Sequence, residues 1–248
     1  MASKTALVTG GIGGIGSATC QQLAKDGMQV YALHLPAEAA QAEQWCEQIR
    51  QQGLVVNIVA ADVSSDASCV TMAADLREQG VSPDVLVNCA GITRDKTLKN
   101  LPPELWEAVI NTNLSSIYHV TRQFSATMAN RGWGRIISIS SVNGQRGMFG
   151  QTNYCAAKAG IHGFTMALAQ ELAAKGVTVN SISPGYIDTA MTQAIPEVIR
   201  NQITASIPIG RMGKPQDIAS TISFLCSEGA SYITGANIPV NGGYFMSF

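Results

Sequence analysis

Short apolar runs alternate with segments of helical periodicity along most of this chain of 248 residues. The apolar runs predict strands at residues 5–8, 30–35, 54–61, 84–87, 135–140 and 177–182. The segments between them predict helices at 14–26, 37–52, 66–79 and 154–175, and a further long helix within 103–130. Repeated β–α units need crossover helices, and these give a parallel sheet that is covered on both faces. The pattern therefore predicts one α/β domain over residues 1–248, a doubly wound parallel sheet.

The composition is that of a protein with a large buried core, because 46% of the residues are apolar and only 13% are charged. The chain has sixteen Lys and Arg residues and seventeen Asp and Glu residues. It therefore lacks the basic excess that is typical of proteins that bind nucleic acid or anionic membranes. No uncharged apolar run has the length of a membrane span, and the first residues lack the apolar core of a signal peptide. We expect a cytoplasmic protein without a nucleic-acid or membrane partner.

The six cysteines are scattered at positions 20, 46, 69, 89, 155 and 226. No pair has the C-x-x-C spacing of a zinc ribbon or a redox dithiol. Single cysteines of this kind are typical of buried thiols in a reducing compartment. We therefore predict no metal site.

A glycine-rich loop, Thr-Gly-Gly-Ile-Gly-Gly-Ile-Gly at 9–16, joins the first predicted strand to the first predicted helix. Glycines let the backbone come close to a pyrophosphate, and the start of the helix offers unpaired N–H groups to that anion. The spacing fits the G-x-G-x-x-G fingerprint of dinucleotide-binding proteins. A tight turn with a purely structural role is the alternative, and the position directly after the first strand argues against it.

A second set of residues has the chemistry of an acid–base site. Tyr154 and Lys158 are four positions apart on a predicted helix, so they share one face. We expect the ammonium group to lower the phenol pKa from its ordinary value near ~10. Ser141 follows the fifth predicted strand and can donate a hydrogen bond to a carbonyl oxygen, and Asn113 can extend a proton relay. Taken alone, a Tyr-x-x-x-Lys pair is more often a surface pair, so its weight comes from the glycine loop that accompanies it.

Over essentially its whole length the sequence resembles the short-chain dehydrogenase/reductase family. The stretches that carry this resemblance stand in the family's order and spacing: the glycine loop at 9–16, Asn88-Cys-Ala-Gly91, Asn113-Leu114, Ser141, Tyr154-Cys-Ala-Ala-Lys158 and Pro184-Gly185. Cys89 departs from the pattern, since the family usually has Asn or Ala there. The resemblance implies a Rossmann-type fold and a nicotinamide dinucleotide cofactor.

The resemblance also implies a role for each matching residue. Tyr154 would be the general acid in reduction, with Lys158 holding the nicotinamide ribose. Ser141 would polarise the substrate carbonyl, and Asn113 would anchor a water relay. Besides Tyr154 and Lys158, the residues implied to bind the cofactor are Gly10, Gly13, Gly14, Ile15, Gly16, Asp62, Val63, Asn88, Ala90, Gly91, Pro184, Gly185, Ile187 and Thr189. Hydride transfer to a carbonyl forms an alkoxide that needs a proton and hydrogen-bond donors, and this set supplies both.

Within the family, several further runs are similar to those of the acetoacetyl-CoA reductases: Asn143-Gly144, Phe149-Gly-Gln-Thr-Asn-Tyr154, Gly163-Phe-Thr-Met166 and Ser183-Pro-Gly-Tyr186. This likeness implies reduction of acetoacetyl-CoA to (R)-3-hydroxybutyryl-CoA for polyhydroxybutyrate synthesis, by a homotetramer. The substrate-binding residues that we expect are Asp95, Asn143, Phe149, Gln151 and Tyr186. A 3-oxoacyl-[acyl-carrier-protein] reductase of fatty acid synthesis is the runner-up. A dinucleotide-binding redox sensor without turnover is a distant alternative, because such proteins usually lose the tyrosine or the lysine.

The choice between NADH and NADPH is open, because the family commonly uses NADPH and the local charge favours NADH. The 2′-phosphate of NADPH is best held by Arg or Lys near the end of the second strand. Here His34 ends that strand, Glu38 follows closely, and no Lys or Arg appears before Arg50. We therefore add His34 and Glu38 to the cofactor-binding residues.

Two further features concern the acyl thioester. Residues 186–212 carry Pro and Gly punctuation and are expected to form a mobile lid, in which Met191, Ile195 and Ile199 have helical spacing. Their alternative role is ordinary core packing. A group of cations after the fourth strand is a candidate contact for the CoA phosphates, although exposed cations are more often simply solvated. This group consists of Arg94, Lys96 and Lys99.

Overall fold

The fold is built on one parallel sheet of seven strands, in the order β3-β2-β1-β4-β5-β6-β7. The computed structural model describes residues 3–193 and 195–246. The strands are β1 (Thr5–Thr9), β2 (Gln29–His34), β3 (Asn57–Ala60), β4 (Val85–Asn88), β5 (Gly134–Ile139), β6 (Val177–Pro184) and β7 (Asn237–Val240). Every neighbouring pair is parallel. The predicted doubly wound α/β sheet is therefore confirmed.

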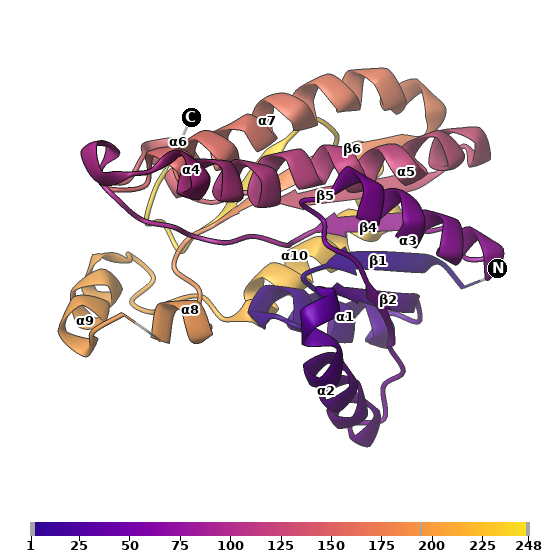
Figure 1. The fold of residues 1–248 in the computed structure, drawn as a ribbon, viewed down its shortest axis with the longest axis horizontal. Coiled ribbons are helices and arrows are strands. Elements are labelled where there is room, and N and C mark those ends of the chain that lie inside the picture. The colour runs from indigo at the N-terminus through magenta and orange to yellow at the C-terminus, as the bar shows by residue number, and fades with distance from the viewer. Residues whose placement is uncertain (1–2, 194, 247–248) are drawn as a thin grey trace.

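Helices cover both faces of the sheet (Figure 1), with α3, α4, α5 and α7 on one side and α1, α2 and α10 on the other. The helices are α1 (Gly14–Lys25), α2 (Ala39–Gln51), α3 (Asp66–Glu78), α4 (Pro103–Ile110), α5 (Ser116–Arg131), α6 (Asn143–Arg146), α7 (Thr152–Leu172), α8 (Ala190–Gln193), α9 (Glu197–Ser206) and α10 (Pro215–Cys226). Alternate side chains of the central strand β1 pack into the cores on the two faces of the sheet. Ala6 and Val8 pack into the core beneath α1 and α10, whereas Leu7 packs into the core on the opposite face.

The order of the strands reverses at β1, and this reversal fixes where a ligand can bind. From β1 the chain builds β2 and β3 outward on one side, and then returns to place β4 on the other side of β1. At such a switch point the loops after the two central strands separate and leave a crevice at their carboxyl ends. The glycine loop follows β1 and the Asn88–Gly91 segment follows β4, so the fold brings these two motifs together.

The structure differs from the sequence prediction in three places. The third strand is shorter than predicted, since it covers only Asn57–Ala60. The long helix expected within 103–130 is interrupted by a turn of π-helix at Asn111–Ser115, which separates α4 from α5. Helix α10 and strand β7 are absent from the prediction. Strand β7 is the outermost strand, and its residues are half-buried or exposed, so the apolar pattern of a buried parallel strand is weak there.

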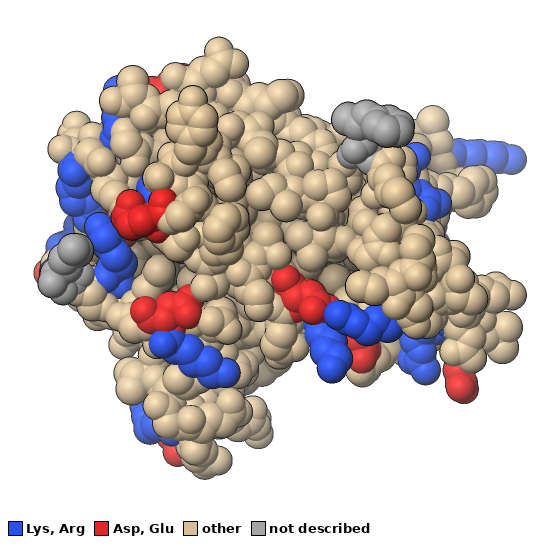
Figure 2. All heavy atoms as spheres, turned by 180° about the vertical axis from the view of Figure 1, so that it is seen from behind, with Lys and Arg blue, Asp and Glu red and all other residues tan. Residues whose placement is uncertain are grey.

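The surface and the cysteines add two observations. Figure 2 shows one face of the molecule, on which basic side chains lie in small groups beside acidic ones, mostly toward the edges. All six cysteines carry free thiols, and Cys20, Cys69 and Cys226 are buried. In the part of the chain that the structure describes, no helix combines the length and the apolar character needed to cross a membrane.

Candidate active site

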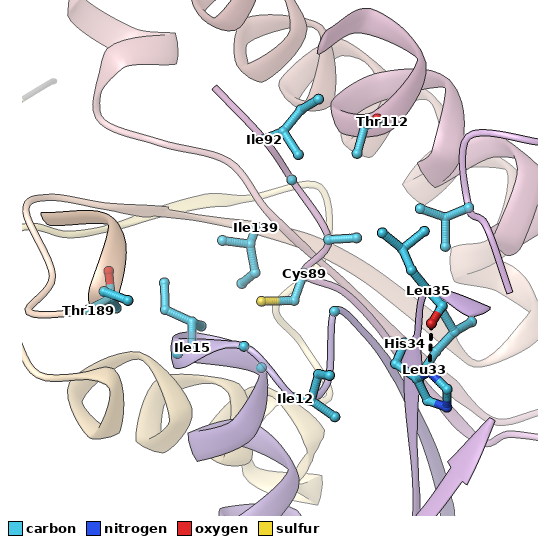
Figure 3. Close-up of a pocket in the computed structure, with 18 of the residues that line it drawn as sticks. Ile12, Ile15, Leu33, His34, Leu35, Cys89, Ile92, Thr112, Ile139 and Thr189 are labelled. Atoms are coloured by element: carbon cyan, nitrogen blue, oxygen red, sulfur yellow. Dashed lines mark hydrogen bonds between the residues drawn. The ribbon is translucent and has the colours of Figure 1, made fainter. Parts of the chain in front are cut away.

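A cleft of about 650 Å³ runs along the carboxyl ends of the central strands. Figure 3 shows Ile12 projecting into it from the glycine loop and Ile15 from the start of α1, with Thr189 beside Ile15. His34 and Leu35 lie at one end of the cleft, and Tyr154 and Lys158 are also among its lining residues. The cleft is thus bounded by loops that follow several different strands, as expected for a doubly wound sheet.

The glycine loop lines the cleft with the backbone of its glycines and with the side chains of Ile12 and Ile15. Gly10 has a φ of 63°, a conformation that favours glycine. A Cβ atom on Gly16 would overlap the carbonyl group of Gly10, and one on Gly14 would lie 2.7 Å from the methyl group of Thr189. Helix α1 begins without a side-chain cap. Its first N–H groups are therefore free to bind an anion, which fits the pyrophosphate of a dinucleotide.

The end of the cleft beyond β2 carries negative charge. The backbone N–H of Leu35 donates to Glu38 Oε2 at 3.0 Å, which holds that carboxylate at the rim of the cleft. His34 is buried, and its Nδ1 lies 2.8 Å from the carbonyl oxygen of Leu35, the contact drawn as a dashed line in Figure 3. Asp62 and Val63 complete this end, and Asp62 Oδ1 accepts from the backbone N–H of Ser64. The group is suited to ribose hydroxyls, which are donors, better than to a phosphate dianion.

Of the residues predicted to bind the cofactor, Asn88 is the one that does not line the cleft. Its side-chain amide lies beneath the floor and donates to Thr121 Oγ1 at 3.2 Å and to Ser138 Oγ at 3.3 Å. The two residues after it are held from the other side, because Thr9 Oγ1 accepts from the backbone N–H groups of Cys89 and Ala90 at 2.9 and 3.0 Å. Asn88 thus supports the loop after β4 from below, while Ala90 and Gly91 form its surface.

Helix α7 and the end of β5 place Ser141, Tyr154 and Lys158 together in the cleft wall. Burial raises the pKa of Tyr154 to about 12, and its hydrogen bond with Ser141 offsets part of this rise. Burial also lowers the pKa of Lys158 to about 8. The Lys158 ammonium donates to the carbonyl oxygen of Ile139 at 2.7 Å and lies 5.6 Å from the centre of the Tyr154 ring. The expectation that Lys158 holds the pKa of Tyr154 below its ordinary value is therefore wrong for the protein alone, because burial of the phenol dominates its pKa.

Asn113 lies in the π-helical turn that separates α4 from α5. Such a turn directs its side chains differently from a regular α-helix and is frequent at functional sites. The Asn113 amide makes two hydrogen bonds with one residue: the backbone N–H of Ile92 donates to Asn113 Oδ1, and Asn113 Nδ2 donates to the Ile92 carbonyl, both at 2.8 Å. A Cβ atom on Gly91 would lie 3.2 Å from Asn113 Oδ1 and 3.5 Å from Lys158 Nζ. Asn113 therefore lies behind the cleft wall, and it clamps the loop that passes beside Lys158.

The residues predicted to bind the substrate lie outside the lining of the cleft, and three of them form a chain of hydrogen bonds beside it. Asn143 Nδ2 donates to Gln151 Oε1 at 3.0 Å, and Gln151 Nε2 donates to Asp95 Oδ2 at 2.7 Å. Asn143 is linked to Ser141, because its backbone N–H donates to Ser141 Oγ at 3.1 Å. Phe149 is 89% exposed. The chain thus connects Ser141 with the loop after β4.

Tyr186 has two neighbours that the sequence did not indicate. Its ring packs edge-to-face on Tyr244, with the ring centres 5.3 Å apart, and the guanidinium of Arg146 lies 4.7 Å from the centre of the Tyr244 ring. Burial raises the pKa of Tyr186. Arg146, Tyr186 and Tyr244 are far apart in the sequence, so no local pattern indicates that they pack together.

The segment expected to form a lid leaves and rejoins the body of the protein at one point. Ile187 and Gly213 form an isolated parallel bridge, in which the backbone N–H of Asp188 donates to Gly213 at 2.8 Å. The helical spacing of Met191, Ile195 and Ile199 does not correspond to one helix. Helix α8 ends at Gln193 and α9 begins at Glu197. Ile199 is 46% exposed, and the side chain of Met191 lies outside the described residues.

Comparison with known proteins agrees with this geometry. A family model described as enoyl-(acyl carrier protein) reductase matches residues 10–245. The chain is 57% identical to an acetoacetyl-CoA reductase of Allochromatium vinosum, over 98% of this chain and 99% of that protein. It is 50% identical to an acetoacetyl-CoA reductase of Cupriavidus necator, over 99% of this chain and all of that protein. It is 43% identical to a 3-oxoacyl-[acyl-carrier-protein] reductase of Pseudomonas aeruginosa, over 98% of each chain.

The fold also matches a solved structure along its whole length. A candidate gluconate dehydrogenase from Agrobacterium tumefaciens has a TM-score of 0.93 and 35% sequence identity, and the match covers 99% of this chain and 97% of that one. The glycine cradle, the cleft at the switch point and these relatives together imply a cofactor of the NAD(P) type. The chain belongs to the short-chain dehydrogenase/reductase family.

Proposed function

We propose that this protein reduces acetoacetyl-CoA to (R)-3-hydroxybutyryl-CoA with a reduced nicotinamide dinucleotide. The observation that carries the proposal is the group of Ser141, Tyr154 and Lys158 in the wall of the dinucleotide cleft. A phenol with a pKa of about 12 stays protonated at neutral pH, so Tyr154 holds the proton that a reduction consumes. The hydroxyl of Ser141, which hydrogen-bonds with Tyr154 in the protein alone, is suited to donate to the carbonyl oxygen of a bound substrate.

Each of these residues has a definite task in the reaction. When bound in the cleft, the reduced nicotinamide supplies a hydride to the carbonyl carbon at position 3 of the acyl group. Tyr154 gives its phenolic proton to the oxygen of the same carbonyl, which becomes the hydroxyl of the product. Lys158 holds the ribose hydroxyls with its ammonium group, and Asn113 fixes the loop of Gly91 and Ile92 beside it. The residues that would hold the rest of the dinucleotide are the glycine loop and the group around Glu38.

A CoA thioester is supported over a carrier-protein thioester by the relatives, since the identity is 57% to an acetoacetyl-CoA reductase and 43% to a carrier-protein reductase. The chain from Asn143 through Gln151 to Asp95 would bind the thioester arm beside the catalytic group. Arg94 lines the cleft, and together with Lys96 and Lys99 it would meet the CoA phosphates. The test is a competition assay with both thioesters at equal concentration. We expect a higher kcat/KM for acetoacetyl-CoA, and a preference for the carrier-protein substrate would reverse this assignment.

For the cofactor we propose a preference for NADH. Glu38 is held at the rim of the cleft by the backbone of Leu35 and would repel a 2′-phosphate, whereas it can accept a hydrogen bond from a free 2′-hydroxyl. His34 is the nearest group that can become a cation, and it is buried. The family resemblance favours NADPH, so a direct comparison of the two cofactors is the test.

Further properties belong to the same proposal. We infer that the protein works in the cytoplasm, in polyhydroxybutyrate synthesis, as a homotetramer of single-domain subunits with residues 186–212 as a lid. Exposed apolar side chains on α4, α5 and α7 support an assembly, namely Trp106, Tyr118 and Met166. Sedimentation equilibrium measures the assembly, and a monomer at micromolar concentration would contradict it.

A further inference from the structure

His162 is a half-buried titratable group that the proposed reaction does not use. It lies on α7 one helical turn after Lys158. Its Nε2 atom is 2.8 Å from Ser140 Oγ and 3.4 Å from Ser183 Oγ. Burial lowers its pKa below the ordinary value of 6.5, so the imidazole is neutral at pH 7. One ring nitrogen therefore contacts two hydroxyls, that of Ser140 directly after β5 and that of Ser183 on β6.

The hydrogen atoms around this nitrogen can be counted. The hydroxyl of Ser140 donates to the backbone carbonyl of Lys158 at 2.8 Å, and the hydroxyl of Ser183 donates to Asn237 Oδ1 at 2.8 Å. Each hydroxyl has only one hydrogen, so neither can also donate to His162. The imidazole must therefore carry its proton on Nε2 and donate to both oxygens. This count assigns one tautomer to His162.

Both serines precede residues of the candidate active site. Ser140 stands directly before Ser141, and its hydrogen bond ties β5 to the backbone of Lys158. Ser183 stands directly before Pro184 and Gly185, which line the cleft. His162 thus joins the three elements that carry the proton donor, the carbonyl-binding hydroxyl and the wall of the cofactor cleft, namely α7, β5 and β6.

We propose that His162 is a positioning residue for this reaction. By donating from Nε2 to Ser140 and Ser183, it fixes the spacing of α7 from β5 and β6, and so the place of Ser141 relative to Tyr154. The inference rests on the proposed reduction. A displacement of catalytic groups by a fraction of an ångström lowers the reaction rate more than it weakens ground-state binding. His162 should therefore affect kcat rather than KM.

The test compares two substitutions at this position. His162→Leu keeps an apolar body of similar size but removes the donor, whereas His162→Gln keeps an N–H donor near the position of Nε2. We expect His162→Leu to lower kcat by about tenfold or more, with the thioester KM and the cofactor Kd changed by no more than about threefold. His162→Gln should restore kcat to within about threefold of the wild-type value. Equal losses in the two variants, or a normal kcat in His162→Leu, would overturn the proposal.

Two controls separate positioning from a general loss of stability. Ile161→Val removes a methyl group from the neighbouring buried residue of α7 and should lower the melting temperature without lowering kcat. In a Ser140→Ala background, His162→Leu should cause a smaller loss than in the wild type, because the contact with Ser140 is already gone and only the contact with Ser183 remains to be removed. Independent, multiplicative losses would contradict the proposal.

The tautomer gives a readout that does not depend on turnover. Nitrogen-15 NMR of the wild-type protein should show the His162 imidazole neutral and protonated on Nε2 at pH 7, with the signal assigned by its loss in His162→Leu. A proton on Nδ1 would contradict the hydrogen count. If the wild-type protein did not reduce the thioester at all, the proposed function would fail, whereas the NMR result would still decide the contact of His162 with the serines.

Discussion

The ammonium nitrogen of Lys158 lies 5.6 Å from the centre of the Tyr154 ring and donates its hydrogen bond to the carbonyl of Ile139. Burial raises the pKa of Tyr154 to about 12 and lowers the pKa of Lys158 to about 8. At neutral pH the protein alone therefore holds a neutral phenol beside a charged amine. These are the protonation states that a reductase needs before the substrate carbonyl takes up hydride.

Removal of the Tyr154 hydroxyl tests the proton donor. Tyr154→Phe keeps the ring and its packing, so cofactor binding should stay close to that of the wild type. Turnover should fall by ~10²–10⁴, the usual effect of losing a general acid. Steady-state kinetics and a fluorescence titration with the reduced cofactor measure the two effects separately. Near-normal turnover in the variant would show that another group supplies the proton.

The pH profile tests the state of Lys158. Burial lowers the pKa of Lys158 from its ordinary value of 10.5 to about 8, so the ammonium is present below pH 8 and is lost as the pH rises through 8. We expect kcat/KM for the reduced cofactor, which reports the free enzyme, to be level below pH 8 and to fall above it. Tyr154 stays protonated throughout this range.

The variant Lys158→Arg is the control for that profile. A guanidinium group keeps its charge at every pH of the assay, so the variant should lose activity overall but no longer show the fall above pH 8. A fall of the same shape in Lys158→Arg would assign the titration to a different group.

The hydrogen-bond chain from Asn143 to Asp95 is tested at its middle residue. Gln151→Ala removes both side-chain contacts of the chain. Hydrogen bonds of this kind contribute about 0.5–1.5 kcal/mol each, so we expect the KM for acetoacetyl-CoA to rise by about tenfold while the cofactor KM stays unchanged. Gln123→Ala on α5 is the matched control, since that amide donates to the backbone of His119. An unchanged thioester KM in Gln151→Ala would remove this chain from the substrate site.

Cofactor choice tests the charge at the far end of the cleft. The measurement is kcat/KM for NADH and for NADPH at one fixed concentration of acetoacetyl-CoA. We expect NADH to be preferred, and Glu38→Gln to shift the ratio toward NADPH, because it removes the charge but keeps an acceptor for the backbone N–H of Leu35. A tenfold or larger preference of the wild type for NADPH, ~1.4 kcal/mol of transition-state binding, would show that this charge does not decide the cofactor.

Much of the fold could be predicted because its signals are local. An apolar run followed by the glycines at 10–16 and a helical period defines β1, the loop and α1 without any distant information. Strand β7 is short and lies at the edge, and the π-helical turn at Asn111–Ser115 joins α4 to α5 without a Gly or Pro that would mark a break. Neither leaves a distinct local pattern, so both were missed.

The site likewise has some features with a local sequence signal and others that depend only on the tertiary fold. The glycine loop, Ser141, Tyr154 and Lys158 could be found from spacing, and the fold brings them to one cleft. The pairing of Tyr186 with Tyr244 depends on two loops that are distant in sequence. The pKa of Tyr154 depends on how deeply the folded protein buries the ring, and that depth is a tertiary property.

The most direct measurement follows the nicotinamide absorbance band after mixing the protein, the reduced cofactor and acetoacetyl-CoA, with the product analysed by chiral chromatography. The account predicts oxidation of one cofactor for each (R)-3-hydroxybutyryl-CoA formed, and no oxidation when the thioester is omitted. If the cofactor binds but neither NADH nor NADPH is oxidised in the presence of the thioester, the protein is not a reductase of this substrate and the central claim is contradicted.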